Sequence, residues 1–100
     1  MSDKVFKYYQ DAGHGWIAVK INDIFDLGIQ HKISQYSYIR GMTAFLEEDC
    51  DAVIFIEAWK SKYSIFQYET KHQGDKSYIR YCDRWAYAAA EEVCKKIKGW

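Results

Sequence analysis

One segment has the residue spacing of a buried helix, and it lies between segments with the composition of strands. Its apolar positions recur at the i, i+3, i+4, i+7 spacing of one helix face: Ala52, Phe55, Ile56 and Trp59. We expect Asp49 to cap this helix, which should continue to about Lys62. A helix of this kind needs an apolar surface to cover, and the flanking strands predict a sheet.

The segments on either side are rich in aromatic and β-branched residues, which favour strands. Three pairs of such segments predict hairpins: 5–10 with 16–19, 35–39 with 43–47, and 63–68 with 77–82. The first pair flanks a turn at 11–15, where two glycines can supply positive φ. The second surrounds Arg40-Gly41-Met42, and the third surrounds a polar loop at 71–76.

Two further helices complete the expected fold. Asn22 is a candidate cap for a short helix that Gly28 would end in the left-handed conformation. An alanine-rich helical pattern begins after Asp83 and ends at Gly99. We therefore predict one α+β domain spanning 1–100, with an antiparallel sheet of about five or six strands, two main helices and one short helix.

The charge balance and the cysteines indicate the kind of partner and the cellular compartment. Fourteen basic and fourteen acidic residues leave no net charge, which argues against a mainly electrostatic nucleic-acid binder. The odd set Cys50, Cys82 and Cys94 has no close pair, as expected of thiols in a reducing cytoplasm. With no apolar run long enough for a signal peptide or a bilayer span, we expect a cytoplasmic protein without membrane contact.

The first candidate site is the turn Gly13-His14-Gly15-Trp16. Flexible backbone beside an imidazole and an indole can form a ligand site, and His14 can titrate near neutral pH. The alternative is an ordinary hairpin turn, with His14 exposed and Trp16 packed on the core. The spacing does not match a phosphate-binding loop, so the turn predicts no particular ligand.

The second candidate site is a group of carboxylates at the start of the central helix. Its members are Glu47, Glu48, Asp49 and Asp51. Such a group can meet a basic patch on a partner or hold a divalent cation, although the spacing is not that of a calcium-binding loop. The alternative is structural, because acidic residues at a helix start favour the positive end of its dipole.

The third candidate is a set of tyrosines that could stack nucleic-acid bases on the open face of the sheet. The set comprises Tyr36, Tyr38, Tyr63, Tyr68, Tyr78 and Tyr81. Arg40, Arg80 and Arg84 could assist such binding. Tyrosine and arginine are also frequent in protein interfaces, and tyrosines pair across strands in ordinary sheets.

Three stretches carry a resemblance to a known group of proteins. They are Asp11-Ala-Gly-His-Gly-Trp-Ile-Ala-Val19, Ile33-Ser-Gln-Tyr-Ser-Tyr-Ile-Arg-Gly41 and Phe45-Leu-Glu-Glu-Asp-Cys-Asp-Ala52. With these motifs, residues 5–60 resemble small proteins encoded by bacteriophages and other mobile elements. The resemblance implies the cytoplasm of an infected bacterium and action by binding, for example to a CRISPR effector or a restriction enzyme. It carries over no catalytic residue.

Together these observations favour a non-enzymatic accessory protein that binds a host protein and could inhibit a defence system. We expect the contact surface at the carboxylates and the preceding hairpin: Tyr36, Tyr38, Arg40, Glu47, Glu48, Asp49 and Asp51. His14 and Trp16 remain a possible ligand turn, and no cofactor or metal is expected. The alternatives are a single-stranded nucleic-acid-binding module and a small metal-dependent or His-assisted enzyme. An exposed edge strand would also allow a homodimer.

Overall fold

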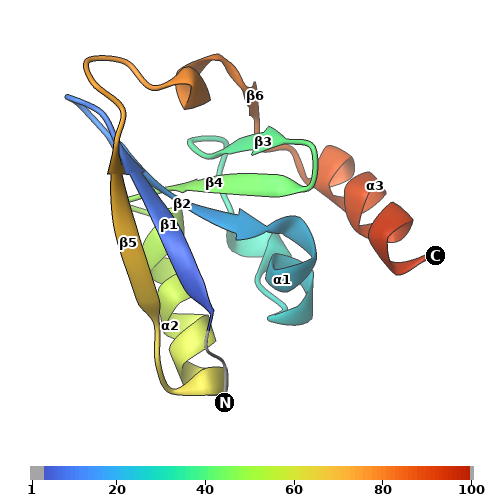
Figure 1. Ribbon diagram of the computed structural model, residues 1–100. Helices are drawn as coiled ribbons and strands as arrows, with labels where there is room; N and C mark the ends of the chain where they lie inside the picture. Colours follow the sequence, from blue (N-terminus) through green and yellow to red (C-terminus); the bar gives the residue numbers. More distant parts are fainter. Residues whose placement is uncertain (1–3, 100) are drawn as a thin grey trace.

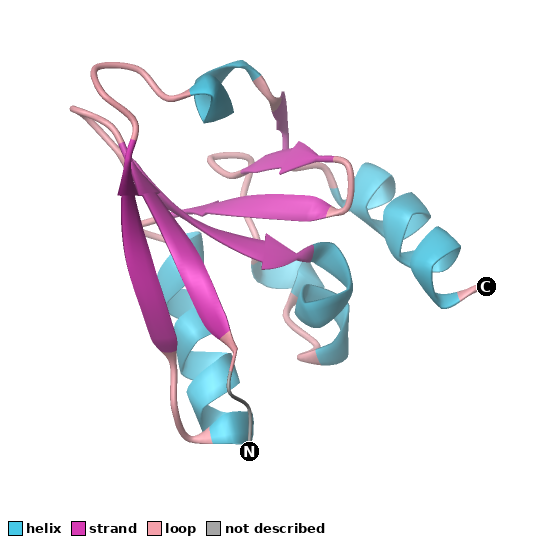
Figure 2. Cartoon of the chain, viewed as in Figure 1, coloured by secondary structure: helices cyan, strands magenta, loops and turns pink. Residues whose placement is uncertain are grey.

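The computed structural model describes residues 4–99, which form strands, helices and two 3₁₀ turns (Figures 1 and 2). The strands are β1 (Val5–Gln10), β2 (Gly15–Lys20), β3 (Tyr38–Arg40), β4 (Thr43–Glu47), β5 (Gln67–His72) and β6 (Asp83–Arg84). The helices are α1 (Ile21–Asp26), α2 (Asp51–Tyr63) and α3 (Tyr87–Lys98), and there are 3₁₀ turns at Gln30–Lys32 and Tyr78–Tyr81. The predicted α+β class is confirmed.

The six strands form one open sheet in the order β5-β1-β2-β4-β3-β6. Four of the neighbouring pairs are antiparallel, as predicted, but β1 and β5 run parallel, so the sheet is mixed. The reason is the connection. Helix α2 carries the chain from β4 to the outer side of β1, and a crossover of this kind permits a parallel pair.

The predicted hairpin of 63–68 with 77–82 is wrong. Helix α2 continues to Tyr63, whose ring packs 4.3 Å from that of Trp59, and the strand begins only at Gln67. The second segment forms a 3₁₀ turn because the Ser77 hydroxyl accepts a hydrogen bond from the Ile79 N–H and Ile79 is fully buried. Local side-chain packing and bonding therefore override the β-forming composition.

The predicted helix ends are more accurate than the predicted helix starts. Gly28 and Gly99 have φ of 70° and 73°, the left-handed conformation expected at helix ends. By contrast, Asn22 does not cap α1, which begins at Ile21, and Asp49 does not cap α2. The residue before α2 is Cys50, whose side chain makes no capping bond.

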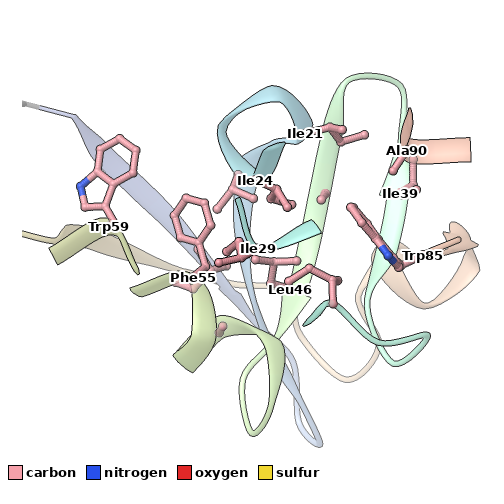
Figure 3. Packing of buried hydrophobic residues seen from close by; sticks show 14 of the residues in the cluster. Ile21, Ile24, Ile29, Ile39, Leu46, Phe55, Trp59, Trp85 and Ala90 are labelled. Carbon is pink, nitrogen blue, oxygen red and sulfur yellow. The ribbon is translucent and has the colours of Figure 1, made fainter. Parts of the chain in front are cut away.

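The two faces of the sheet are covered differently. One face packs against all three helices, and Figure 3 shows part of this core, including Phe55 and Trp59 of α2, Ile24 of α1 and Ala90 of α3. The opposite face has a smaller cluster: Trp16, Tyr38, Phe45 and Ile79. The segment 73–84, which passes from β5 to β6 over one end of the sheet, supplies Ile79 (Figure 1).

Candidate functional site

The site lies on the sheet face opposite the helices, where strand register lines up polar and aromatic side chains. Because side chains alternate between faces, residues paired across strands share one face. One row runs from Tyr9 through Trp16 to Glu47, and the next contains Phe45 and Tyr38. The smaller cluster thus forms the floor beneath the segment 73–84.

A buried carboxylate attaches that segment to the sheet. The side chain of Asp11 accepts hydrogen bonds from the N–H groups of Gly13 (3.0 Å), His14 (2.9 Å) and Ser77 (2.9 Å). It also accepts two bonds from the Arg80 guanidinium, at 2.5 Å from Nε and 2.8 Å from Nη2. The guanidinium and these N–H groups hold the pKa of Asp11 far below its usual range. The carboxylate therefore fixes the position of Arg80.

The two glycines of the turn serve close packing rather than positive φ, which corrects the sequence interpretation. The glycines with positive φ lie elsewhere in the chain. A Cβ at Gly15 would lie 1.9 Å from the Tyr8 hydroxyl oxygen, and one at Gly13 would lie 3.0 Å from Arg80 Nη2. Gly15 therefore needs glycine because Tyr8 occupies the space, whereas a Cβ at Gly13 would require only a small shift of the Arg80 side chain.

Three arginines of this face lie over aromatic rings. The Arg80 guanidinium carbon is 5.7 Å from the centre of the Trp16 ring, and that of Arg84 is 5.1 Å from the Tyr38 ring. Arg84 also donates a hydrogen bond of 3.1 Å to the Gln35 carbonyl. These cation–π contacts hold the guanidinium planes in defined orientations.

The third arginine contact lies on the other side of the 3₁₀ turn. The Arg40 guanidinium carbon is 5.2 Å from the centre of the Tyr78 ring. Burial raises the pKa of Tyr78, so its hydroxyl stays neutral and keeps its proton for donation. Arg40 and Tyr78 therefore continue the arginine–aromatic pattern to the edge of the sheet.

The exposed tyrosines and arginines of this face, together with the half-buried Arg80, form one surface, which we call the tyrosine–arginine surface. It comprises Tyr36, Arg40, Tyr78, Arg80, Tyr81 and Arg84. Tyr36 and Tyr81 are the most exposed of its aromatic residues, at 61% and 76%. Large aromatic side chains at this exposure are costly to leave in water and are enriched at recognition surfaces.

Two hollows flank the 3₁₀ turn within this surface. The smaller, of about 170 Å³, is lined by His14, Trp16, Tyr36, Tyr38, Glu47, Arg80 and Arg84. The larger, of about 430 Å³, is lined by Ile39, Arg40, Gly41, Tyr78, Tyr81, Cys82 and Asp83. The smaller hollow unites two separate sequence predictions, the histidine turn and the hairpin tyrosines. Trp16 and Tyr38 are themselves buried and contribute little of the accessible surface.

The structure corrects the predicted acidic contact surface. Asp51 is 1% exposed, and its carboxylate accepts hydrogen bonds from the Ser34 N–H and from the Ser34 and Ser37 hydroxyls. Asp51 is therefore a structural residue that joins the start of α2 to the chain before β3. Tyr38, 9% exposed, likewise belongs to the cluster beneath the surface.

The other carboxylates are divided between structural and exposed roles. Glu47 accepts hydrogen bonds from the N–H groups of Asp49 (3.0 Å) and Cys50 (3.1 Å), which stabilises the turn before α2. Glu48 accepts a hydrogen bond from the Tyr8 hydroxyl, and burial together with Glu48 raises the pKa of Tyr8. Of the four carboxylates predicted at the contact surface, Asp49 is exposed, Glu47 and Glu48 are half-buried, and Asp51 is buried.

Other predicted residues lie outside the site, and some site residues escaped prediction. Tyr63 ends α2 and Tyr68 lies on β5, away from the tyrosine–arginine surface. The role of Asp11 was not predicted, although an aspartate at the start of a glycine turn commonly accepts N–H bonds from the following residues. Its pairing with Arg80 joins residues far apart in sequence, and no local pattern predicts that contact.

The described residues lack both a metal-binding cluster and a membrane-spanning helix. Residues 4–99 contain no cluster of three or more histidine, cysteine, aspartate or glutamate side chains suited to a metal ion. No helix in the same range combines the length and apolar character that crossing a bilayer requires. Comparison with protein-family models, curated proteins and solved structures finds no match.

Proposed function

We propose that this chain is a non-enzymatic binding protein that engages another protein through its tyrosine–arginine surface. The observation that carries the proposal is the set of exposed tyrosines and oriented arginines around two hollows. Tyrosine, tryptophan and arginine are the residues that most often dominate protein interfaces. The hollows offer space for side chains of the partner beside these residues.

The arginines are already oriented before a partner arrives. Arg80 is held by Asp11 and by the Trp16 ring, and Arg84 by the Tyr38 ring and the Gln35 carbonyl. Side chains held in this way lose less conformational entropy on binding than free ones do. This arrangement supports recognition of partner carboxylates or carbonyl groups by guanidinium donors.

The charge pattern favours a protein partner over single-stranded nucleic acid. The surface arginines Arg40, Arg80 and Arg84 are accompanied by Asp11, Glu47 and Asp83. A nearly balanced surface lacks the excess positive charge that a phosphate backbone requires. The Tyr38 and Tyr78 rings also have arginines over them, so they are less open to stacked bases.

The same geometry supports binding rather than catalysis. His14 and Glu47 line one hollow, but the Glu47 carboxylate accepts hydrogen bonds from backbone N–H groups rather than orienting the imidazole. In many enzymes a histidine that acts as a base is oriented by a third side chain, and the Glu47 carboxylate does not supply that contact to His14 here. In the setting that the phage-type sequence resemblance implies, the partner is a protein of the infected bacterium, with a defence complex as the first candidate.

The proposal is tested by affinity capture from a bacterial lysate with matched variants. Arg84→Ala removes an exposed guanidinium that lies over the buried Tyr38 ring. Lys62→Ala is the control, because Lys62 lies 5.4 Å from the Tyr63 ring at the end of α2, outside the site. We expect the wild-type protein and the Lys62→Ala variant to capture the same proteins. The double variant, Arg84→Ala with Tyr81→Ala, should no longer capture them.

A salt titration with single-stranded DNA and RNA distinguishes the remaining alternative. We expect no binding at low salt for the wild-type protein. Binding that weakens steeply with salt and depends on Arg40 and Arg84 would instead identify a nucleic-acid partner.

In the lysate experiment, capture that is unchanged in the double variant, Arg84→Ala with Tyr81→Ala, would show that the tyrosine–arginine surface is not the contact surface.

A further inference from the structure

Strand β5 forms one edge of the sheet and is exposed along its whole length. All six residues from Gln67 to His72 are exposed, and within the described chain β5 pairs only with β1 (Figure 1). Its outer edge therefore presents unpaired backbone donors and acceptors. Such an edge is a template for another strand, and proteins usually cover or interrupt one of this length.

The pairing with β1 shows which residues face the free edge. The Gln73 N–H donates to the Gln10 carbonyl at 2.7 Å, so the backbone of Gln73 faces β1. Since backbone groups alternate along a strand, those of residues 69 and 71 face β1 as well. The backbone N–H and C=O groups of Tyr68, Thr70 and His72 therefore face outward.

We propose that β5 pairs antiparallel with β5 of a second copy of this chain, with the twofold axis at Thr70. In this register Thr70 faces its own equivalent and Tyr68 faces the partner's His72. These are hydrogen-bonded positions, because each of these residues directs its backbone outward. The two sheets then join through β5 into one continuous sheet.

Charge complementarity selects this register. Pairing about Thr70 places Glu69 opposite the partner's Lys71 and Lys71 opposite the partner's Glu69. Shifting the axis to Glu69 would place two glutamates face to face, and shifting it to Lys71 would oppose two lysines. Like charges directly opposite destabilise a strand pair, whereas unlike charges stabilise it.

The two charges already form a pair within one chain. Lys71 Nζ lies 3.3 Å from Glu69 Oε1, and both side chains are about half exposed, at 47% and 52%. An isolated pair at this exposure contributes little to stability. In the dimer the four side chains form an alternating group, and they lie in non-hydrogen-bonded pairs, where cross-strand side chains come closest.

The dimer leaves the proposed binding surface accessible. Strand β5 is at one edge of the sheet, whereas β3 and β6, which carry Arg40 and Arg84, are at the other. Arg40 and Arg84 would lie far from the β5 junction, and β5 itself contributes no residue to the tyrosine–arginine surface. This inference is therefore independent of the proposed function, and either can fail without the other.

Sedimentation velocity over a range of concentrations tests the dimer. Wild-type protein is expected to shift from monomer to dimer between about 1 µM and about 1 mM, the range of weak to moderate affinities. Glu69→Lys and Lys71→Glu each oppose like charges and should remain monomeric over this range. The double variant, Glu69→Lys with Lys71→Glu, restores unlike pairs and should recover the dimer.

Two controls keep the result interpretable. Glu91→Lys reverses a partly exposed charge on α3, remote from β5, and should dimerise like wild type. Thr70→Pro removes an outward-facing N–H and leaves the pairing with β1 intact, so it should abolish the dimer with an unchanged circular dichroism spectrum. A wild-type protein that stays monomeric, or single charge variants that dimerise as wild type does, would overturn the inference.

Discussion

The two faces of the sheet are stabilised by different means. On the helix face, α1, α2 and α3 bury aliphatic and aromatic side chains in one cluster, which includes the fully buried Phe55 (Figure 3). On the opposite face, a small aromatic cluster lies beneath a segment that the Asp11 carboxylate attaches through hydrogen bonds. One face is covered by apolar packing, and the other by directed polar bonds.

This difference separates stability from recognition. Apolar burial is non-directional, so it stabilises the fold without fixing the orientation of particular side chains. The helix face therefore contributes to stability rather than to recognition. Polar bonds are directional, and on the opposite face they hold arginines and tyrosines at the surface in defined positions. We therefore expect variants of the helix face to change stability and variants of the tyrosine–arginine surface to change binding.

The largest expected effect is on the helix face. Phe55→Ala removes a fully buried ring that packs against Phe6 and Trp59. We expect the free energy of unfolding to fall by about 4 kcal/mol, because the variant loses apolar transfer energy and leaves a cavity. Urea unfolding followed by tryptophan fluorescence measures this change. A loss below about 1 kcal/mol would mean that this cluster is not the main source of stability.

The next effect is at the polar attachment of the opposite face. Asp11→Ala leaves Arg80 and several N–H groups without their acceptor. We expect a loss of about 3 kcal/mol, as for removal of one partner from a buried ion pair. The same unfolding measurement applies, and the change should also weaken partner capture, because Arg80 is no longer positioned. Phe55→Ala should weaken capture only as far as it unfolds the protein.

The pH dependence of stability tests the role of the Asp11 carboxylate separately. The pKa of Asp11 in the folded state is far below its unfolded value of about 3.9. The folded state therefore binds fewer protons than the unfolded state does. The stabilising contribution of the Asp11 carboxylate is present above about pH 4 and is lost as the pH falls further. We expect the stability difference between wild type and Asp11→Asn to shrink as the pH falls below about 4. A constant difference would contradict the assignment.

A smaller effect is expected at the turn between β1 and β2. Gly15→Ala places a Cβ within 2.4 Å of the Tyr8 ring carbon that carries the hydroxyl, and Tyr8 must move. We expect a loss of about 2 kcal/mol, typical of overpacking. Gly13→Ala is the matched control, because its new Cβ meets only the end of the Arg80 side chain. Thermal unfolding should rank Gly15→Ala as the more damaging change, and the reverse order would contradict this account of the turn.

The smallest effect on stability is expected at the tyrosine–arginine surface itself. Tyr81 is 76% exposed and Arg84 is exposed, so Tyr81→Ala and Arg84→Ala should each change the unfolding free energy by less than about 0.5 kcal/mol. Circular dichroism melting curves measure this directly. A large loss of stability would place these residues among the structural elements of the face instead.

Local patterns in the sequence predicted much of the fold. The spacing of Ala52, Phe55 and Trp59 identified α2, and Gly28 and Gly99 identified two helix ends, because these signals lie within a few residues. The strand at 77–82 and the Asp49 cap were wrong. At 77–82, burial of Ile79 competed with the local preference for a strand. At Asp49, the Glu47 carboxylate accepts a hydrogen bond from the Asp49 N–H and so competed with the predicted cap. A local pattern shows neither contact.

The site was predicted only in part for the same reason. The sequence placed Tyr36 and Glu47 on one expected contact surface and His14 in a separate turn, and the structure brings all three to one hollow. The pairing of Asp11 with Arg80 spans most of the chain and depends on the path of the segment after β5. The burial of Asp51 likewise follows from serines on another segment, so its charge alone suggested an exposed residue.

Site-specific photo-crosslinking tests the central claim most directly. A photoreactive amino acid replaces Tyr81 on the tyrosine–arginine surface or, as the control, Val53, which is 46% exposed on α2. In a bacterial lysate, we predict a discrete protein adduct from the Tyr81 position that disappears when Arg84→Ala is added, and no such adduct from the Val53 position. Equal labelling from both positions, or an adduct that is indifferent to Arg84→Ala, would contradict the account.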